Sequence, residues 1–249
     1  MKFECTEVWG FEHALRGMRN PMNSWEKSDS GYKTKTMTSM AEMAETLRCM
    51  AYCGFEIGEN DLKLAQTLIK AGSEHRKFMR QIFVSVDVTA PLYWWKEFDT
   101  YKVGTVANST STMHKLASTP ITLDCFETDN VEILEELNYE VSCWWGELVS
   151  WLEKLRQLHN KNMELSKAPN ITDQERKRLI VMAKRYWKEL IRLLPESWLQ
   201  KRTVTMNYEN ILSMIHQRKG HKLTEWSKDF IEWAETLPYA KELLFYKGQ

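Results

Sequence analysis

The sequence predicts an α+β protein: a predominantly helical single domain with a small mixed or antiparallel sheet. Long stretches repeat apolar residues every three or four positions, which is the period of an amphipathic helix. One short stretch alternates apolar and polar residues instead, which is the period of a half-buried strand. No convincing interdomain linker interrupts the chain, and 249 residues are enough to bury one sizeable core. We therefore expect one domain over residues 1–249.

The first 72 residues predict two helices and one loop. Residues 20–38 are polar and are expected to form a flexible loop. Residues 39–54 predict a helix that ends near Gly54. A second helix follows, and we expect Asn60 to cap its start and Gly72 to end it.

The clearest strand is IFVSVDVTAP, from Ile82 to Pro91. Branched apolar residues occupy every second position, and Pro91 closes the run because proline cannot donate to a strand ladder. A short helix rich in aromatic residues should follow, with Tyr93, Trp94 and Trp95 in the core.

The C-terminal half predicts helices. From Asn130 to about Leu165 the apolar spacing indicates one long amphipathic helix or two nearly collinear ones. The next helix should be capped by Thr172 or Asp173 and should end before Pro195. Further helical segments are expected at about 207–218, 222–236 and 238–246.

Composition argues against several classes of function. Lys plus Arg equals Asp plus Glu at 34 each, so the basic surplus that nucleic acids or anionic membranes attract is missing. No apolar run approaches the ~20 residues that span a bilayer, and Glu4 and Glu7 interrupt any signal-peptide core. Five scattered cysteines do not form a disulfide framework, so a reducing cytoplasm is the expected compartment.

Local motifs for catalysis or metal binding are also missing from the sequence. It contains no P-loop, no dinucleotide-binding glycine pattern, no hydrolase nucleophile elbow and no His-x-x-x-His pair. Cys49 and Cys53 share one helix face, but a zinc site needs two more ligands at sensible spacing. We expect these two thiols to be buried core residues and expect no metal.

The stretch YKVGTVANSTSTMHK, from Tyr101 to Lys115, is small, polar and rich in hydroxyl groups. Such a composition is typical of a linker. It is equally typical of a loop whose backbone N–H groups and hydroxyls approach an anionic ligand. The local sequence leaves both interpretations open.

Residues 74–115 contain, in order, the segments HRKFMRQ, IFVSVDV, APLYWWKEF and TYKVGTVANSTSTM. This order resembles that of the flavin-dependent thymidylate synthases, which have a histidine segment, a strand, a proline, an aromatic helix and then the signature Arg-His-Arg-x-x-Ser-x-Asn-x-x-Ser-x-Arg. With one residue inserted before Asn108, the signature's Arg-His-Arg falls on Thr100-Tyr101-Lys102 and its first serine on Thr105. Its asparagine then falls on Asn108, its second serine on Ser111 and its last arginine on Met113.

Residues 190–237 resemble the same family more closely. The family has Leu-Pro, a threonine-rich segment, Asn-x-Arg, a helix that ends in Arg, and then His-Ala-Gln-Trp-Glu. Here LLPESWLQKRTVTMNYENILSMIHQR runs without a gap through Asn207 to Arg218. With one residue fewer, the match continues to His221 and Glu225.

The resemblance implies a homotetramer that binds FAD between subunits. Reduced flavin then relays a one-carbon unit from methylenetetrahydrofolate to C5 of dUMP, with NADPH as the reductant, so the cofactor carries the chemistry. The implied flavin-contacting residues are His75, Lys102, Asn108, Asn207 and His221. The implied nucleotide-contacting residues are Gly104, Thr105, Ser111 and Arg218. No catalytic side chain is singled out.

Two of these residues have a second, purely structural interpretation. Asn207 is a good N-cap for a helix that begins at Tyr208, and capping and flavin contact can coexist. Arg218 stands where a cation favours the C-terminal end of a helix dipole.

The sequence departs from the family mainly in its positive charge. Of the three arginines in the signature only Lys102 remains a cation, and lysine cannot reproduce bidentate contacts. Lys77 replaces a family serine, and Glu209 stands where the family has arginine. These losses favour an alternative function, a catalytically inactive homologue of the same fold that binds nucleotide or serves assembly. A third hypothesis is an unrelated helical interaction protein, which would lack the small sheet around 82–88.

Overall fold

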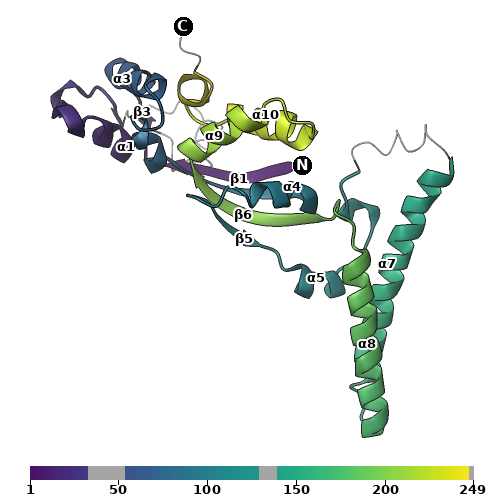
Figure 1. Cartoon of the computed structure of the whole chain (residues 1–249). Helices are drawn as coiled ribbons and strands as arrows, with labels where there is room; N and C mark the ends of the chain where they lie inside the picture. Colours follow the sequence, from purple (N-terminus) through teal and green to yellow (C-terminus); the bar gives the residue numbers. More distant parts are fainter. Residues whose placement is uncertain (33–53, 129–138, 247–249) are drawn as a thin grey trace, which may run out of the picture. The chain divides into compact units, whose positions relative to one another are not determined.

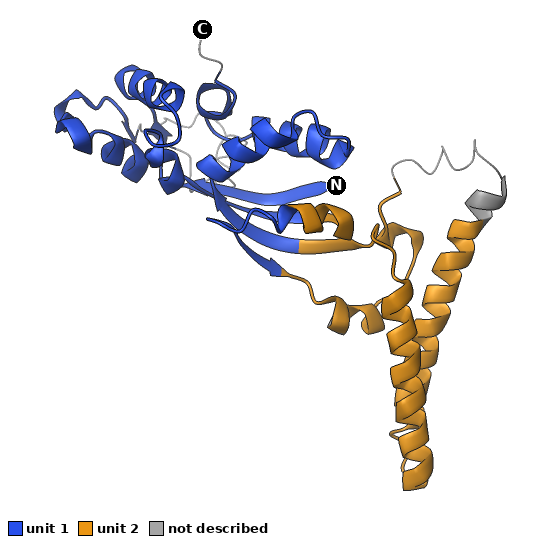
Figure 2. Cartoon of the chain, in the orientation of Figure 1, with its two compact units in different colours: residues 1–88, 98–108, 202–249 blue, residues 89–97, 109–201 orange. Residues whose placement is uncertain are grey.

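The computed structural model of the chain describes residues 1–32, 54–128 and 139–246. It has the α+β architecture that the sequence predicts, mostly helical with a small antiparallel sheet (Figure 1). The chain divides into two compact units (Figure 2), unit 1 with residues 1–88, 98–108 and 202–249, and unit 2 with residues 89–97 and 109–201. The single domain over 1–249 therefore stays a prediction. The predicted helix over 39–54, with Cys49 and Cys53, lies almost entirely outside the described residues.

The four-stranded sheet confirms the predicted strand and adds others that we did not predict. Its order is β1-β4-β6-β5, with bounds Lys2–Trp9, Phe83–Pro91, Leu199–Asn207 and Val106–Ser109. In β4 the side chains of Val84, Val86 and Val88 are buried, whereas Phe83 is 37% exposed. The Thr203 hydroxyl donates to Asp87 Oδ1 at 2.6 Å, which ties β6 to β4.

The rest of unit 1 consists of helices, short turns and a two-stranded antiparallel sheet. The α-helices are α1 Phe11–Met18, α3 Glu59–Lys70, α9 Tyr208–Arg218 and α10 Ile231–Glu235. The shorter elements are η1 Asn20–Met22, η2 Trp25–Lys27, η3 Lys77–Gln81, the π-helical η5 Glu225–Phe230 and η6 Ala240–Leu244, and the paired β2 Gly31–Tyr32 and β3 Phe55–Glu56. Residues 20–32 of the expected loop thus form defined turns and a strand, while 33–38 lie outside the described residues.

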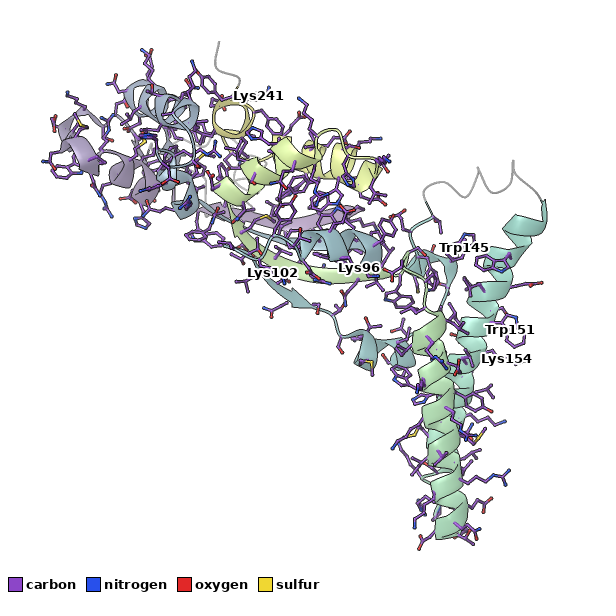
Figure 3. The ribbon with its side chains drawn as sticks, in the orientation of Figure 1. Lys96, Lys102, Trp145, Trp151, Lys154 and Lys241 are labelled. Carbon is purple, nitrogen blue, oxygen red and sulfur yellow. The ribbon has the colours of Figure 1, made fainter. Side chains whose placement is uncertain are left out.

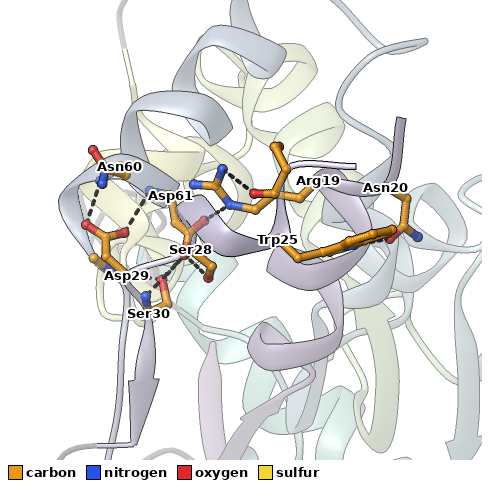
Figure 4. A network of polar contacts seen from close by, with 10 residues as sticks. Arg19, Asn20, Trp25, Ser28, Asp29, Ser30, Asn60 and Asp61 are labelled. Carbon is orange, nitrogen blue, oxygen red and sulfur yellow. Dashed lines mark hydrogen bonds and ion pairs between the residues drawn. The ribbon is translucent and has the colours of Figure 1, made fainter. Parts of the chain in front are cut away.

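The start of α3 corrects the predicted cap. Gly58, not Asn60, occupies the N-cap position, and Asn60 lies inside the first turn. The cap is supplied from a distant segment, because Asp29 accepts hydrogen bonds from the backbone N–H groups of Asn60 at 2.9 Å and Asp61 at 3.1 Å (Figure 4). An acidic side chain at a helix N-terminus satisfies the unpaired N–H groups and favours the dipole.

A buried ion pair joins α3 to the turn after α1. Arg19 Nε lies 2.5 Å from Asp61 Oδ1, and these side chains are 4% and 0% exposed (Figure 4). Ser28 and Ser30 donate to the other carboxylate oxygen at 2.7 and 2.5 Å. Burial alone raises the pKa of Asp61, but the hydrogen bonds from Ser30, Ser28 and Arg19 outweigh burial and lower the pKa. The network therefore fixes residues 19–30 against α3.

Unit 2 contains a helical hairpin with its own core. Its elements are α4 Leu92–Phe98, α5 Thr112–Ser118, η4 Leu123–Cys125, α7 Tyr139–Leu165 and α8 Asp173–Leu193. The core cluster consists of Leu116, Ile121, Phe126, Leu152 and Leu190. Thr172 caps α8 as predicted, because it accepts from Glu175 N at 3.2 Å. Trp94 and Trp95 are 1% exposed, as expected, whereas Trp151 on α7 is 59% exposed with Lys154 5.1 Å from its ring (Figure 3).

The helix predicted from Asn130 to about Leu165 is confirmed as α7 over the part that the structure describes. Within the described residues, no helix combines the length and the apolar character that crossing a membrane requires.

Candidate functional site

Asn207 caps α9, as predicted. Its side-chain oxygen accepts from Asn210 N at 3.0 Å, and Asn210 Oδ1 accepts from Asn207 N at 3.2 Å. This reciprocal pair is a capping box that uses an asparagine at the third helical position. The Asn207 side-chain oxygen is therefore occupied within unit 1, and Asn207 is only 8% exposed.

The same helix start holds the turn at Gly104. Asn210 Nδ2 donates to Val103 O at 2.7 Å, directly before the glycine. Gly104 has φ +79°, in the region that favours glycine, and a β-carbon there would lie 2.9 Å from Asn210 Oδ1 and 3.0 Å from Asn207 Nδ2. Gly104 thus forms a tight turn, and the main observed role of this glycine is to let the loop approach α9 closely.

Arg218 is the last residue of α9, and its guanidinium contacts two aromatic rings, those of Tyr101 and Trp226. Its Cζ lies 4.8 Å from the Trp226 ring centroid and 5.4 Å from the Tyr101 ring centroid. Its Nε donates to the Tyr101 hydroxyl at 2.8 Å. Both rings attract the guanidinium through their electron-rich faces, and the hydrogen bond adds a fixed direction. Arg218 is therefore a half-buried, oriented cation and not a freely solvated helix-end residue.

Glu209 pairs with Arg76. The guanidinium and carboxylate form a bidentate ion pair, with Nε 2.8 Å from Oε2 and Nη2 3.0 Å from Oε1, and the side chains are 17% and 15% exposed. The negative charge at position 209, where the resembled family has arginine, is thus neutralised next to the first turn of α9.

His75 lines a pocket in unit 1. The pocket has a volume of about 510 Å³ and lies between the turn after α1, helix α3 and η3. Met18, Leu64, Leu68 and Phe78 supply an apolar lining, whereas Glu74, His75 and Lys77 add a carboxylate, a ring and a cation. This combination of apolar walls with a few polar groups is typical of small-molecule and cofactor sites.

The other expected site residues are dispersed. Lys102 is exposed in the turn before β5 (Figure 3), and Asn108 is exposed within β5. Thr105 donates its hydroxyl to Tyr101 O, so this hydroxyl hydrogen is used within the loop. His221 directly follows α9, where its Nδ1 accepts from Leu223 N at 3.2 Å. Ser111 belongs to unit 2 and is exposed directly before α5.

The structure therefore brings Gly104 together with Asn207, and places Arg218 and His221 at one end of α9. It also shows four residues that sequence reasoning missed: Arg76, Tyr101, Asn210 and Trp226. Only Asn210 carried a local signal, because an N-cap followed by an amide or carboxylate three residues later is a capping-box pattern. Among the described residues, no group of three or more His, Cys, Asp or Glu side chains could hold a metal ion.

The fold of the chain is similar to that of two solved flavin-dependent thymidylate synthases. One solved structure, flavin-dependent thymidylate synthase ThyX from Helicobacter pylori in complex with FAD and dUMP, superposes with a TM-score of 0.59 at 17% identity and covers 98% of each chain. A second structure of ThyX from Helicobacter pylori, also with FAD and dUMP, has a TM-score of 0.57 at 17% identity, covering 98% of this chain and 97% of that one. No family model and no curated protein sequence matches the chain. The likeness therefore establishes the fold.

Proposed function

We propose that this chain is a divergent flavin-dependent thymidylate-synthase-like enzyme that acts on a pyrimidine nucleotide, as a homotetramer. The reaction is transfer of a one-carbon unit from methylenetetrahydrofolate to C5 of dUMP or a related nucleotide, with FAD as cofactor and NADPH as reductant. The observation that carries this proposal is the oriented Arg218 guanidinium, which stands at the end of α9 on a fold shared with ThyX.

On the nucleotide side, Arg218 supplies directional donors. A guanidinium offers a planar fork that suits uracil carbonyls or a phosphate. Tyr101, Val103 and Gly104 lie along α9, which holds the turn in place through Asn210. Gly104 lets this turn pack closely against α9, and its backbone N–H is the proposed contact to the nucleotide. Thr105 is a further proposed nucleotide contact in unit 1, and Ser111 in unit 2 stays a prediction from the resemblance.

On the flavin side, the pocket at His75 fits part of a dinucleotide. Its volume of about 510 Å³ and its apolar lining suit a flat heterocycle, and Lys77 suits a neighbouring phosphate. We assign His75, Lys102, Asn108, Asn207 and His221 as flavin contacts, with Asn207 also serving as the cap. When bound, FAD supplies the redox chemistry and relays the one-carbon unit. The protein's part is to hold and orient the reactants and to exclude water.

An absorbance spectrum of the purified protein tests this proposal first. We expect the visible absorbance bands of an oxidised flavin, either as isolated or after incubation with FAD. We also expect dUMP to raise the melting temperature, because a ligand that binds only the folded state stabilises it. Absence of flavin uptake at tens of micromolar FAD, together with no thermal shift from dUMP, would refute the proposal.

The pairing of cations within unit 1 favours a second candidate, a catalytically inactive homologue that binds nucleotide or serves assembly. Arg202 pairs with Asp99 at 2.7 Å and Arg76 with Glu209, so neither offers its full charge to an anionic ligand. In unit 2, Met113 is 58% exposed at the position of the signature's last arginine. Complementation of a thymidine auxotroph separates the two candidates: growth without thymidine excludes the inactive homologue. Nucleotide binding without growth, from a protein shown to be expressed and folded, excludes the enzyme.

A further inference from the structure

Tyr101 occupies the position of the histidine in the resembled Arg-His-Arg segment, and its side chain reaches α9 and the π-helical η5. Its hydroxyl donates to Gln217 Oε1 at 3.0 Å and accepts from Arg218 Nε at 2.8 Å. Its ring lies 6.1 Å from the Trp226 ring, centroid to centroid. Tyr101 therefore contacts both a neutral amide and a cation at the end of α9.

Gln217 determines which way the tyrosine hydroxyl points. A phenol has one hydrogen to donate, and here it goes to Gln217 Oε1. The oxygen then presents a lone pair to the Nε–H of Arg218. Gln217 is itself oriented, because its Nε2 donates to Ser213 Oγ at 3.1 Å one turn earlier on the exposed side of α9. The hydrogen bonds thus form one series in which each group donates to the next, from Arg218 to Tyr101, from Tyr101 to Gln217 and from Gln217 to Ser213.

The two aromatic rings hold the guanidinium from one side. Because the Tyr101 and Trp226 centroids are only 6.1 Å apart, Arg218 Cζ contacts both rings in a corner and is not sandwiched between them. Trp226 is 0% exposed and packs on Phe230 with ring centroids 5.2 Å apart, so the Trp226 ring is held in a fixed position. The Tyr101 ring is the second aromatic surface that contacts the guanidinium. Its hydroxyl also accepts the hydrogen bond from Arg218 Nε, which restricts rotation of the guanidinium about the Cδ–Nε bond.

We propose that Tyr101 is a positioning residue that fixes the Arg218 guanidinium in the orientation that contacts the nucleotide. The inference rests on the proposed function, because Arg218 is the proposed nucleotide contact. An unrestrained arginine loses side-chain entropy when it binds, and fixing it beforehand removes that cost. Tyr101 thereby compensates for part of the affinity lost with the signature arginines.

A measurement without ligand tests the positioning itself. Protein labelled with ¹⁵N at arginine Nε is compared as wild type, Tyr101→Phe and Tyr208→Phe, with the Arg218 signal assigned from its loss in Arg218→Lys. Tyr208 is the matched control, because it is a tyrosine at the start of α9 whose hydroxyl also donates a hydrogen bond, to Pro238 O at 2.6 Å, at the end of the helix away from Arg218. We expect exchange of the Arg218 Nε–H with water to become about tenfold faster in Tyr101→Phe, as for loss of one hydrogen bond to a charged group, and to stay unchanged in Tyr208→Phe.

Binding measurements then test the consequence for the ligand. We expect Tyr101→Phe to raise the dissociation constant for dUMP about tenfold, whereas FAD affinity and the Tyr208→Phe variant change little. Unchanged Nε–H exchange in Tyr101→Phe would overturn the positioning role. Accelerated exchange with unchanged dUMP affinity, or an equal loss of affinity in both variants, would overturn the role in binding. If wild-type protein binds no dUMP, the proposed nucleotide site fails and this role in binding fails with it, while the exchange result still decides whether Tyr101 orients Arg218.

Discussion

Arg76 and Glu209 form a bidentate ion pair between the turn before η3 and the first turn of α9, with N–O distances of 2.8 and 3.0 Å. The two residues lie far apart in the sequence, and both side chains are largely buried. Glu209 also stands in the first turn of α9, where an acidic side chain favours the helix dipole. The glutamate that departs from the resembled Asn-x-Arg pattern is thus part of the fold of unit 1.

Removing one member of this pair should destabilise the protein. We expect Glu209→Gln or Arg76→Gln to lower the free energy of unfolding by about 2 kcal/mol each, between the values for exposed and buried pairs. The double variant should lose less than the sum of the two, because each single change leaves a partner unpaired. Urea unfolding at one fixed protein concentration measures all four species. Additive losses would mean that the two side chains do not interact energetically.

Gly104→Ala should destabilise the turn at the candidate site. The substitution places a β-carbon at φ +79° and within 3.0 Å of both Asn210 Oδ1 and Asn207 Nδ2, so the loop or the cap must move. We expect a loss of about 2 kcal/mol in unfolding free energy and weaker nucleotide binding.

The matched control for Gly104→Ala is Gly146→Ala on α7, where a β-carbon would meet nothing within 4 Å. There alanine is the better helix former, so we expect a gain of about 0.5–1 kcal/mol in unfolding free energy. Thermal or urea unfolding distinguishes the two signs. A loss at Gly146 similar to that at Gly104 would indicate that the effect comes from the added methyl group and not from the turn.

The sequence predicted the elements whose signals are local. The alternation in β4, the caps at Thr172 and Asn207 and the end of the helix before Pro195 depend only on residues close together in the chain. It did not predict β1, because in Lys2–Trp9 only Val8 is buried, so no alternation of apolar residues marks the strand. Strand β6 was missed although its C-terminal half alternates, with Val204 and Met206 buried, because the polar residues before them hid the pattern.

The candidate site was predictable only in part, for the same reason. Gly104 and Asn207 were named as site residues through the family resemblance, and local sequence indicated only the capping role of Asn207. The Tyr101–Arg218 hydrogen bond and the Arg76–Glu209 ion pair each join residues more than a hundred positions apart. The residue pattern around one partner therefore gives no indication of the other. The correction at Asn60 is similar, because the carboxylate that caps α3 comes from Asp29.

Asp61→Asn should be among the more damaging substitutions in unit 1. It leaves the 4%-exposed Arg19 without its counter-charge and weakens the hydrogen bonds from Ser28 and Ser30. We expect a loss of about 3 kcal/mol in unfolding free energy, because breaking a buried pair leaves an uncompensated charge. The control is Glu59→Gln on the same helix, whose pair with Lys63 is well exposed and should matter little. Equal effects of the two substitutions in urea unfolding would contradict the importance of burial.

The same substitution should also disturb the pocket at His75. Asn20 and Pro21, which directly follow Arg19, line this pocket together with Ser24, and Arg19 Nη1 donates to Ser24 O at 3.2 Å. We therefore expect Asp61→Asn to weaken FAD binding under conditions where the variant is still folded, as circular dichroism can verify. Unaltered FAD affinity in the folded variant would mean that the network does not support a flavin pocket.

Glu153 on α7 should make the stability of unit 2 depend on acidic pH. Hydrogen bonds from Arg156, with a smaller contribution from Ile121 N and Gln157 and against the opposing effect of burial, lower the pKa of this carboxyl to about 2. A pKa that is lower in the folded than in the unfolded state contributes stability that is complete above the unfolded value of about 4.5 and is lost as pH falls towards about 2. After allowance for the 20% exposure of Glu153, we expect Glu153→Gln to lower the free energy of unfolding by about 2 kcal/mol at pH 7 and by progressively less between pH 4.5 and 2.

The control is Glu147→Gln, which replaces an exposed glutamate on the same helix. Urea unfolding across this pH range should show the stabilities of wild type and Glu153→Gln converging, while Glu147→Gln follows wild type throughout. A constant difference between Glu153→Gln and wild type across this range would mean that lost packing, and not the charge of Glu153, accounts for the effect.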